Sequence, residues 1–169
     1  MACSVNISSY ALSNCFSSRG GVKAAWLAVY VPSAYTITSA DTVSGFASGI
    51  TWYKQELRHN TGSLTSTLNA NDDNGTSYVT TEAVIVYSKM DKENRMNAAA
   101  LTKGDFLCII EDANGAFYAL GEEEPVKALS GTGETGTARD DANRYQISVT
   151  DYNSTFPKML DSAAIALLP

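Results

Sequence analysis

One segment, Tyr78 to Leu120, constrains the fold of this chain more than any other. It begins with a long alternating apolar run, continues into a polar-to-alanine stretch, and ends with two short apolar runs around a turn. A helix is expected over about residues 91–103, with Asp91 as its N-cap residue and Gly104 just past its end. The remainder of the chain favours strands, so one helix flanking antiparallel strands is predicted.

The predicted fold class is mainly β, an antiparallel β-sandwich or half-barrel with this one flanking helix. A length of 169 residues suits one domain. Residues 1–21 are expected to form an N-terminal arm, and residues 22–169 a single β-rich domain. Loops at about 58–63 and 130–143 are expected to serve assembly. The apolar C-terminal tail, Ala163–Pro169, is expected to pack on its own domain or on a neighbour.

Strands are predicted where apolar residues alternate or cluster between turn signals: Lys23–Tyr30, Tyr35–Thr38, Ile50–Leu57, Ser63–Asn69, Tyr78–Tyr87, Phe106–Ile110, Ala116–Leu120 and Arg144–Thr150. The Asn-Gly pair within Asn71–Thr76 predicts a tight hairpin turn. Ile50–Leu57 and Ser63–Asn69, joined through Asn60-Thr-Gly62, are predicted to form a long hairpin. Loops are predicted at Thr42–Gly49 and Ser130–Asn143.

The composition favours contact with other proteins over contact with nucleic acid. Charged residues make up 18% of the chain, and most other polarity comes from Ser, Thr and Asn. Neutral hydroxyls cost less to desolvate than ions, which suits a surface covered by another protein. A net charge of -6 argues against wrapping a phosphate backbone. It is compatible with a passage through which DNA slides without binding.

Three cysteines, Cys3, Cys15 and Cys108, give an odd count without a CxxC pair. Neither a disulfide framework nor a zinc site is therefore predicted, and Cys108 is expected to be a buried thiol. The chain shows no secretory signal and no apolar run of membrane-spanning length. Synthesis in a cytoplasm, without a membrane partner, is the expectation.

No motif in the chain predicts catalysis, a cofactor or a metal. Gly131–Gly136 has the G-x-G-x-x-G spelling, but a strand and not a helix is expected after it, so a flexible loop is favoured. Asn71–Thr76 is favoured as a hairpin turn over a calcium loop. His59, the one histidine, and Glu122–Glu124 are expected to be solvated. The chain is therefore not expected to be an enzyme.

Two stretches carry a resemblance to a known family. Phe106–Gly121, which ends Tyr-Ala-Leu-Gly, resembles a strand pair of bacteriophage tail proteins. Ser130–Ile147 resembles a Gly/Thr-rich loop, Asp/Asn turn and Tyr-x-Ile strand of tail structural proteins from phages that infect Bacteroidetes. The order of strands, one helix after the longest strand, and further strands resembles the tail tube fold. The likeness covers roughly Tyr78 to Thr150.

This resemblance implies a virion structural protein of the tail, made in the host cytoplasm. The most favoured role is a tail tube subunit whose copies form stacked rings around a DNA channel. Its partners would be copies of itself, other tail or neck proteins, and double-stranded DNA that passes without specific binding. The alternatives are a head–tail connector or neck ring protein, and a carbohydrate- or receptor-binding β-domain of a fibre that uses Trp26 or Trp52.

The resemblance also suggests which residues meet DNA or neighbouring subunits. The candidate lumen acids are Glu56, Asp72 and Asp73. The candidate interface residues are Trp52, Tyr53, Leu64, Leu68, Gly131, Gly133, Gly136, Arg139, Ile165, Leu167 and Leu168. Residues 130–143 and the C-terminal tail are expected to become ordered only on assembly. Deleting 130–143 is expected to leave a folded monomer that assembles poorly.

Overall fold

The computed structural model describes residues 9–10, 18–38 and 40–169. Most of the predicted arm over 1–21, including Cys3 and Cys15, lies outside these residues. The described strands are β1 (Val22–Val29), β2 (Tyr35–Ile37), β3 (Val43–Phe46), β4 (Tyr53–Glu56), β5 (Ser63–Asn71), β6 (Thr76–Tyr87), β7 (Phe106–Asp112), β8 (Phe117–Leu120), β9 (Lys127–Glu134) and β10 (Arg144–Asn153). The described helices are α1 (Lys92–Leu101) and α2 (Ser162–Ile165).

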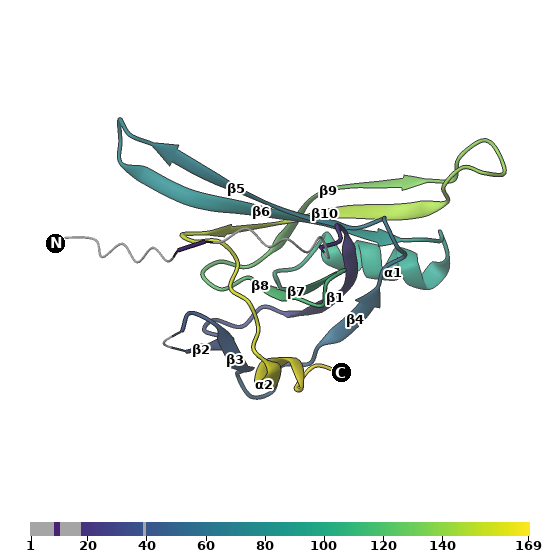
Figure 1. Ribbon diagram of the computed structural model, residues 1–169. Coiled ribbons are helices and arrows are strands. Elements are labelled where there is room, and N and C mark those ends of the chain that lie inside the picture. Colours follow the sequence, from purple (N-terminus) through teal and green to yellow (C-terminus); the bar gives the residue numbers. More distant parts are fainter. Residues whose placement is uncertain (1–8, 11–17, 39) are drawn as a thin grey trace.

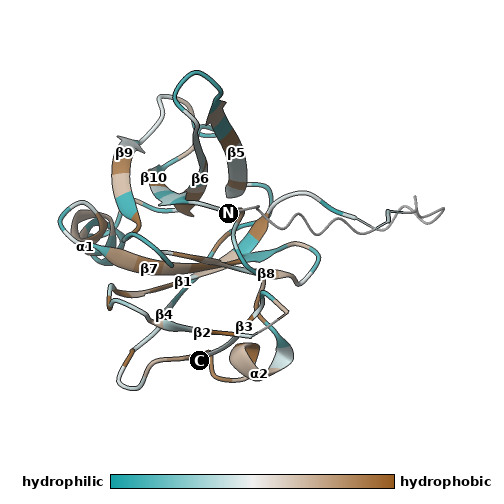
Figure 2. Ribbon diagram, turned by 90° about the vertical axis from the view of Figure 1, so that its left-hand side faces the viewer, coloured by the Kyte–Doolittle hydropathy of each residue, from teal (hydrophilic) through white to brown (hydrophobic). Residues whose placement is uncertain are grey.

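The strands form an antiparallel sandwich, which confirms the predicted fold class. One sheet has the order β4-β1-β7-β8 and the other β5-β6-β10-β9. The two sheets stack, and the β2–β3 hairpin with α2 covers the far face of the first sheet (Figures 1 and 2). The first sheet is therefore the middle layer of three.

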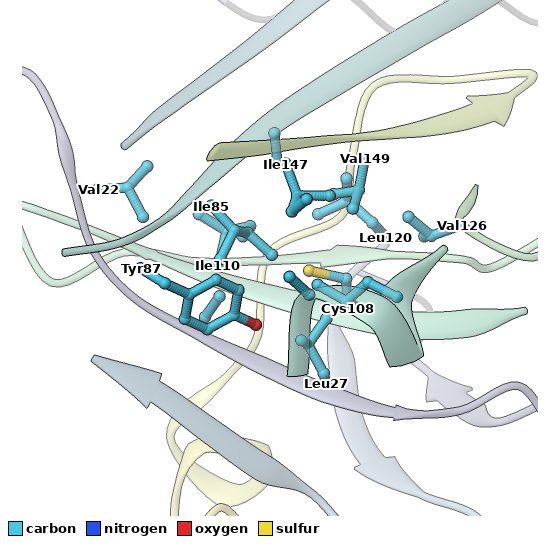
Figure 3. Close-up of a cluster of buried hydrophobic side chains, with 14 residues drawn as sticks. Val22, Leu27, Ile85, Tyr87, Cys108, Ile110, Leu120, Val126, Ile147 and Val149 are labelled. Atoms are coloured by element: carbon cyan, nitrogen blue, oxygen red, sulfur yellow. The ribbon is translucent and has the colours of Figure 1, made fainter. Parts of the chain in front are cut away.

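Burial on both faces explains why β1 and β7 read as nearly continuous apolar runs. Alternate residues such as Leu27 and Cys108 enter a cluster between the two sheets, the inter-sheet core, which α1 also covers (Figure 3). Their neighbours Trp26 and Leu107 enter a second cluster beneath β2, β3 and α2, the lower core. Cys108 is free and buried, as predicted, and burial raises the pKa of its thiol.

The predicted helix is confirmed at its start and differs at its end. Asp91 is the N-cap residue, and its Oδ1 accepts a hydrogen bond of 2.8 Å from the backbone N–H of Asn94. The helix ends at Leu101, earlier than expected, with Thr102 as its C-cap. Ala98 and Leu101 anchor it on the inter-sheet core.

The predicted hairpin of Ile50–Leu57 with Ser63–Asn69 is wrong. β4 pairs with β1 in one sheet, and β5 pairs with β6 in the other. The turn at Asn60–Gly62 carries the chain between the sheets, and Gly62 bridges to Val22. Both strands alternate as hairpin strands do, and alternation does not reveal which neighbour a strand pairs with.

The long hairpin of the molecule is β5–β6, closed by the turn predicted at Asn71–Thr76. Asn71 Oδ1 accepts from the backbone N–H of Asp73, and Asn74 Oδ1 accepts from that of Thr76. Gly75 takes a φ of 68°, the left-handed conformation that this turn requires. The end of this hairpin projects beyond the sandwich (Figure 1).

Three elements were not predicted from the sequence. β3 lies within the expected loop at Thr42–Gly49, and β9 includes the first residues of the expected loop at Ser130–Asn143. The C-terminal tail begins in α2, whose N-cap is Asp161. Ile165 and Leu168 of the tail pack on the lower core, so the tail packs on its own domain, one of the two expected outcomes. No helix in the described part of the chain is long and apolar enough to cross a membrane.

Candidate self-assembly surface

The edge strands of the two main sheets differ in how they are protected from further pairing. An unprotected edge presents a row of free backbone groups and is a template for another strand. The outer edge of β8 is covered by the chain's own segment 158–160. There the backbone N–H of Ala119 donates to Lys158 O across 2.9 Å, and that of Leu160 donates to Phe117 O across 3.0 Å.

The edge of β4 is protected in a different way. β4 has 4 residues, and Lys54 and Glu56 place opposite charges on it, 3.1 Å apart. Short length and charged side chains both discourage strand addition.

The edges of β5 and β9 lack both kinds of protection. β5 has 9 residues, with the sequence SLTSTLNAN, and none is charged. β9 has 8 residues, and its charges are its first residue, Lys127, and its last, Glu134. These two strands are the opposite edges of one sheet. They are therefore the edges most open to pairing among the described strands.

The two free edges run in opposite directions. Each neighbouring pair in the order β5-β6-β10-β9 is antiparallel, which makes β5 antiparallel to β9. When β9 of one molecule meets β5 of the next, the antiparallel alternation of the sheet therefore continues.

Gly131 and Gly133 lie on the face of β9 that continues the inter-sheet core. A β-carbon on Gly131 would come within 2.7 Å of Ile147 Cδ1, and one on Gly133 within 2.9 Å of Tyr145 Cε1. The side chains of β10 thus cover the glycine backbone of the edge strand. This gives the first two glycines of the G-x-G-x-x-G spelling a packing role in a strand, and a second strand, β10, follows them.

The loop between β9 and β10 is built around Asp141. Its Oδ2 accepts from the backbone N–H groups of Thr137 and Ala138, at 2.6 Å and 2.7 Å. These bonds, the one to Ala138 first, lower the pKa of the Asp141 carboxyl. Gly136 has a φ of 66° and passes close to Asp141, while Arg139 is exposed. The loop thus has defined local hydrogen bonds within one chain.

The outer face of the β5-β6-β10-β9 sheet, opposite the inter-sheet core, is rich in hydroxyl groups. Its exposed and half-buried hydroxyl residues are Ser63, Thr65, Thr67, Thr76, Tyr78, Thr80, Ser130, Thr132, Ser148 and Tyr152. Glu82 is exposed near the centre of this face and makes no ion pair with a described residue. The other acid, Glu134, pairs with Arg144 at 2.5 Å, and Lys127 lies 3.8 Å from Asp105.

The predicted lumen acids do not lie on one surface. Asp72 and Asp73 are at the tip of the β5–β6 hairpin, whereas Glu56 belongs to β4 in the other sheet (Figure 1). Glu82 was missed as a candidate. The alternation of β6 was the signal, because it places Glu82 on the other face of the sheet from the buried Ala83 and Ile85.

The predicted interface residues separate into three groups. Leu64, Leu68, Gly131 and Gly133 lie on the two free edge strands, and Leu68 is 55% exposed. Gly136 and Arg139 are in the loop after β9. The third group lies outside the β5-β6-β10-β9 sheet and consists of Trp52, Tyr53, Ile165, Leu167 and Leu168.

The prediction that Trp52 is an interface residue is wrong. It is 8% exposed and packs in the lower core beside Tyr35 and Phe46, with its ring centroid 5.0 Å from that of Phe46. Trp26 is buried in the same cluster, so neither indole offers a free face for a sugar. Of the tail residues, Leu167 is 60% exposed, while Ile165 and Leu168 pack internally.

Tyr53 lines an apolar groove between α1 and the β1–β4 edge. The groove is lined by Leu27, Ala28, Val29, Tyr53, Gln55, Tyr87, Asn97, Ala100, Leu101 and Phe106. Its lining contains no carboxylate, amine, thiol or imidazole. It offers apolar contact area.

A buried carboxyl lies where β10 leaves the inter-sheet core. Asp151 is 0% exposed and lies opposite the buried Thr81. Its Oδ2 accepts from Asn153 Nδ2 at 2.5 Å, while Oδ1 has no hydrogen-bond partner among the described residues. Burial, together with the charges of Glu122 and Glu123, raises the pKa of Asp151 to about 7.

No family model matches this chain, and no curated protein and no solved structure matches it either. The class that the geometry itself defines is a three-layer antiparallel β protein with two open edges on one sheet.

Proposed function

We propose that this chain is a virion structural protein, a tail tube subunit that assembles with copies of itself into stacked rings around a DNA channel. The observation that carries the proposal is the pair of long edges, β5 and β9, on one sheet, without charges between their ends. Natural monomers protect such edges, and here the other two edges of the main sheets are protected.

Opposite edges favour rings or tubes over closed pairs of subunits. A contact between β9 of one copy and β5 of the next uses two different surfaces, so it is heterologous and repeats until it closes. Each added copy contributes 4 strands to a continuing sheet. Closure removes every free edge of that sheet, as in other β-barrels.

The outer face of the sheet suits a channel that DNA passes through. Hydroxyl groups hydrate the surface without adding the positive charge that non-specific DNA binding needs, and Glu82 adds one negative charge per copy near the middle of the face. Like charges repel phosphate within about a Debye length, ~10 Å at 0.1 M salt, so this face would not grip the backbone.

The test is the oligomeric state of the purified full chain, measured by light scattering and negative-stain microscopy over rising protein concentration without DNA. Rings or tubes of uniform diameter are expected. Tubes of variable length favour the tail tube subunit, and single rings that never stack favour a connector or neck ring. A chain that stays monomeric at every concentration contradicts the proposal.

A further inference from the structure

The two open edges match each other in one particular register, and this inference rests on the proposed function. The register follows from which side chains share a face, from strand length, and from one exposed leucine on each edge.

Face matching limits the alternatives. Residues directly opposite each other in an antiparallel pair point to the same side of the sheet. On β9, Gly131 and Gly133 lie on the inner face, next to Ile147 and Tyr145 of β10. On β5, Leu64 lies on the inner face, where it packs on the inter-sheet core. Between Ser130 and Glu134, an odd-numbered residue of β9 must therefore lie opposite an even-numbered residue of β5. At Leu129 a β-bulge interrupts the alternation, so that Ala128 pairs with Val149 and faces inward.

Strand length then limits this set. When Glu134 lies opposite Ser63 of the next copy, Ser130 lies opposite Thr67, and every residue from Ser130 to Glu134 gains a partner. A shift of two residues toward Gly62 leaves Gly133 and Glu134 without a partner in β5, whereas a shift of two residues toward Asn71 keeps them all paired. Because each pair adds backbone hydrogen bonds, these two registers are favoured.

The exposed leucines select between the two registers. Leu68 of β5 is 55% exposed and Leu129 of β9 is 61% exposed. With Glu134 opposite Ser63, Leu129 lies next to Leu68 of the next copy, whereas the register shifted toward Asn71 places it beside Asn69 and Ala70. Burial of two exposed leucines favours association.

We propose that β9 of one copy pairs with β5 of the next with Thr132 opposite Thr65, Ser130 opposite Thr67, and Leu129 next to Leu68. The partner that these edges fit is a second copy of this chain, joined head to tail.

Disulfide trapping tests the register directly. In a Cys3→Ser, Cys15→Ser background, with the buried Cys108 retained, the matched pairs are Thr65→Cys with Thr132→Cys and Thr67→Cys with Ser130→Cys. The control pairs recombine the same substitutions, as Thr67→Cys with Thr132→Cys and Thr65→Cys with Ser130→Cys. A disulfide needs β-carbons about 4 Å apart, which directly opposite residues approach and diagonal ones, at about 7–8 Å, do not.

Oxidation of each matched pair is expected to give a ladder of linked oligomers on a non-reducing gel. Oxidation of the recombined pairs is expected to give no ladder. A ladder from the recombined pairs, or no ladder from particles that still form, overturns the register and leaves the proposed function standing. If the parent chain forms no particles and no pair cross-links, the proposed function fails and the register fails with it.

Discussion

The δ-methyl group of Ile147 lies over Gly131 on the neighbouring strand, so that a β-carbon added to Gly131 would come within 2.7 Å of it. Ile147 is itself part of the inter-sheet core and has little room to move. The edge strand β9 thus packs closely against a side chain of β10 at a position that has no β-carbon.

Gly131→Ala is expected to lower the free energy of unfolding by about 1 kcal/mol, because overpacking displaces Ile147 or the backbone of β9. The measurement is urea unfolding followed by tryptophan fluorescence. Gly20→Ala is the matched control, since a β-carbon there meets nothing within 4 Å. Equal stability of the two variants would mean that Ile147 adjusts without cost.

The buried carboxyl of Asp151 makes stability depend on pH. Its pKa is raised to about 7 from an ordinary value of 3.8, so the folded state binds the proton more tightly than the unfolded state. Stability is therefore greatest when Asp151 is protonated and falls as the pH rises between about 4 and 7, by on the order of 4 kcal/mol in all.

Asp151→Asn is expected to remove this dependence, because the amide has nearly the same shape as the protonated acid and never ionises. The variant should unfold at a higher temperature than the parent at pH 8, with a much smaller difference at pH 5. Thermal unfolding at both pH values measures this, with the exposed Asp140→Asn as control. An unchanged pH profile in the Asp151 variant would contradict the assignment.

The sequence pattern predicted the parts of the fold that a local signal specifies without an alternative structure. The Asn-Gly turn, the N-cap at Asp91 and the alternation of β6 are local, and each lies where it was predicted. Pairing is not local. β4 pairs with β1 and not with β5, which is the edge strand of the other sheet.

The candidate surface was only partly predictable for the same reason. Leu68 and the glycines of β9 were named, but the edge on which they lie depends on the strand order of the sheet. Trp52 was misassigned because an aromatic residue beside a strand has the same sequence signature in a core as at an interface. Glu82 was overlooked because its importance comes from the face it shares with neighbouring strands.

Reversing the charge of the outer face is expected to make assembled particles bind DNA. Glu82→Lys changes the central charge of that face from negative to positive in every copy, and lysines hold phosphate through counterion release. Fluorescent double-stranded DNA should bind assembled particles of the variant at low salt and dissociate from them as the salt concentration rises. It should not bind assembled particles of the parent. Glu93→Lys is the control, since it makes the same charge change on the exposed face of α1.

A lysine on the β5 edge is expected to prevent assembly without harming the fold. Leu68→Lys replaces a side chain that is 55% exposed, so the monomer should keep its circular dichroism spectrum and unfolding temperature. In the assembled sheet that charge would be placed against Leu129 of the next copy and desolvated, and charged edges resist strand addition. Light scattering should therefore report a monomer.

Ala163→Lys, on the exposed face of α2 at the opposite side of the molecule, should assemble as the parent does (Figure 1). Adding Leu129→Glu to Leu68→Lys should restore assembly, because the two opposite charges would lie side by side at the contact and attract each other. Assembly of Leu68→Lys alone at the parent's concentration would show that β5 is not the contact edge.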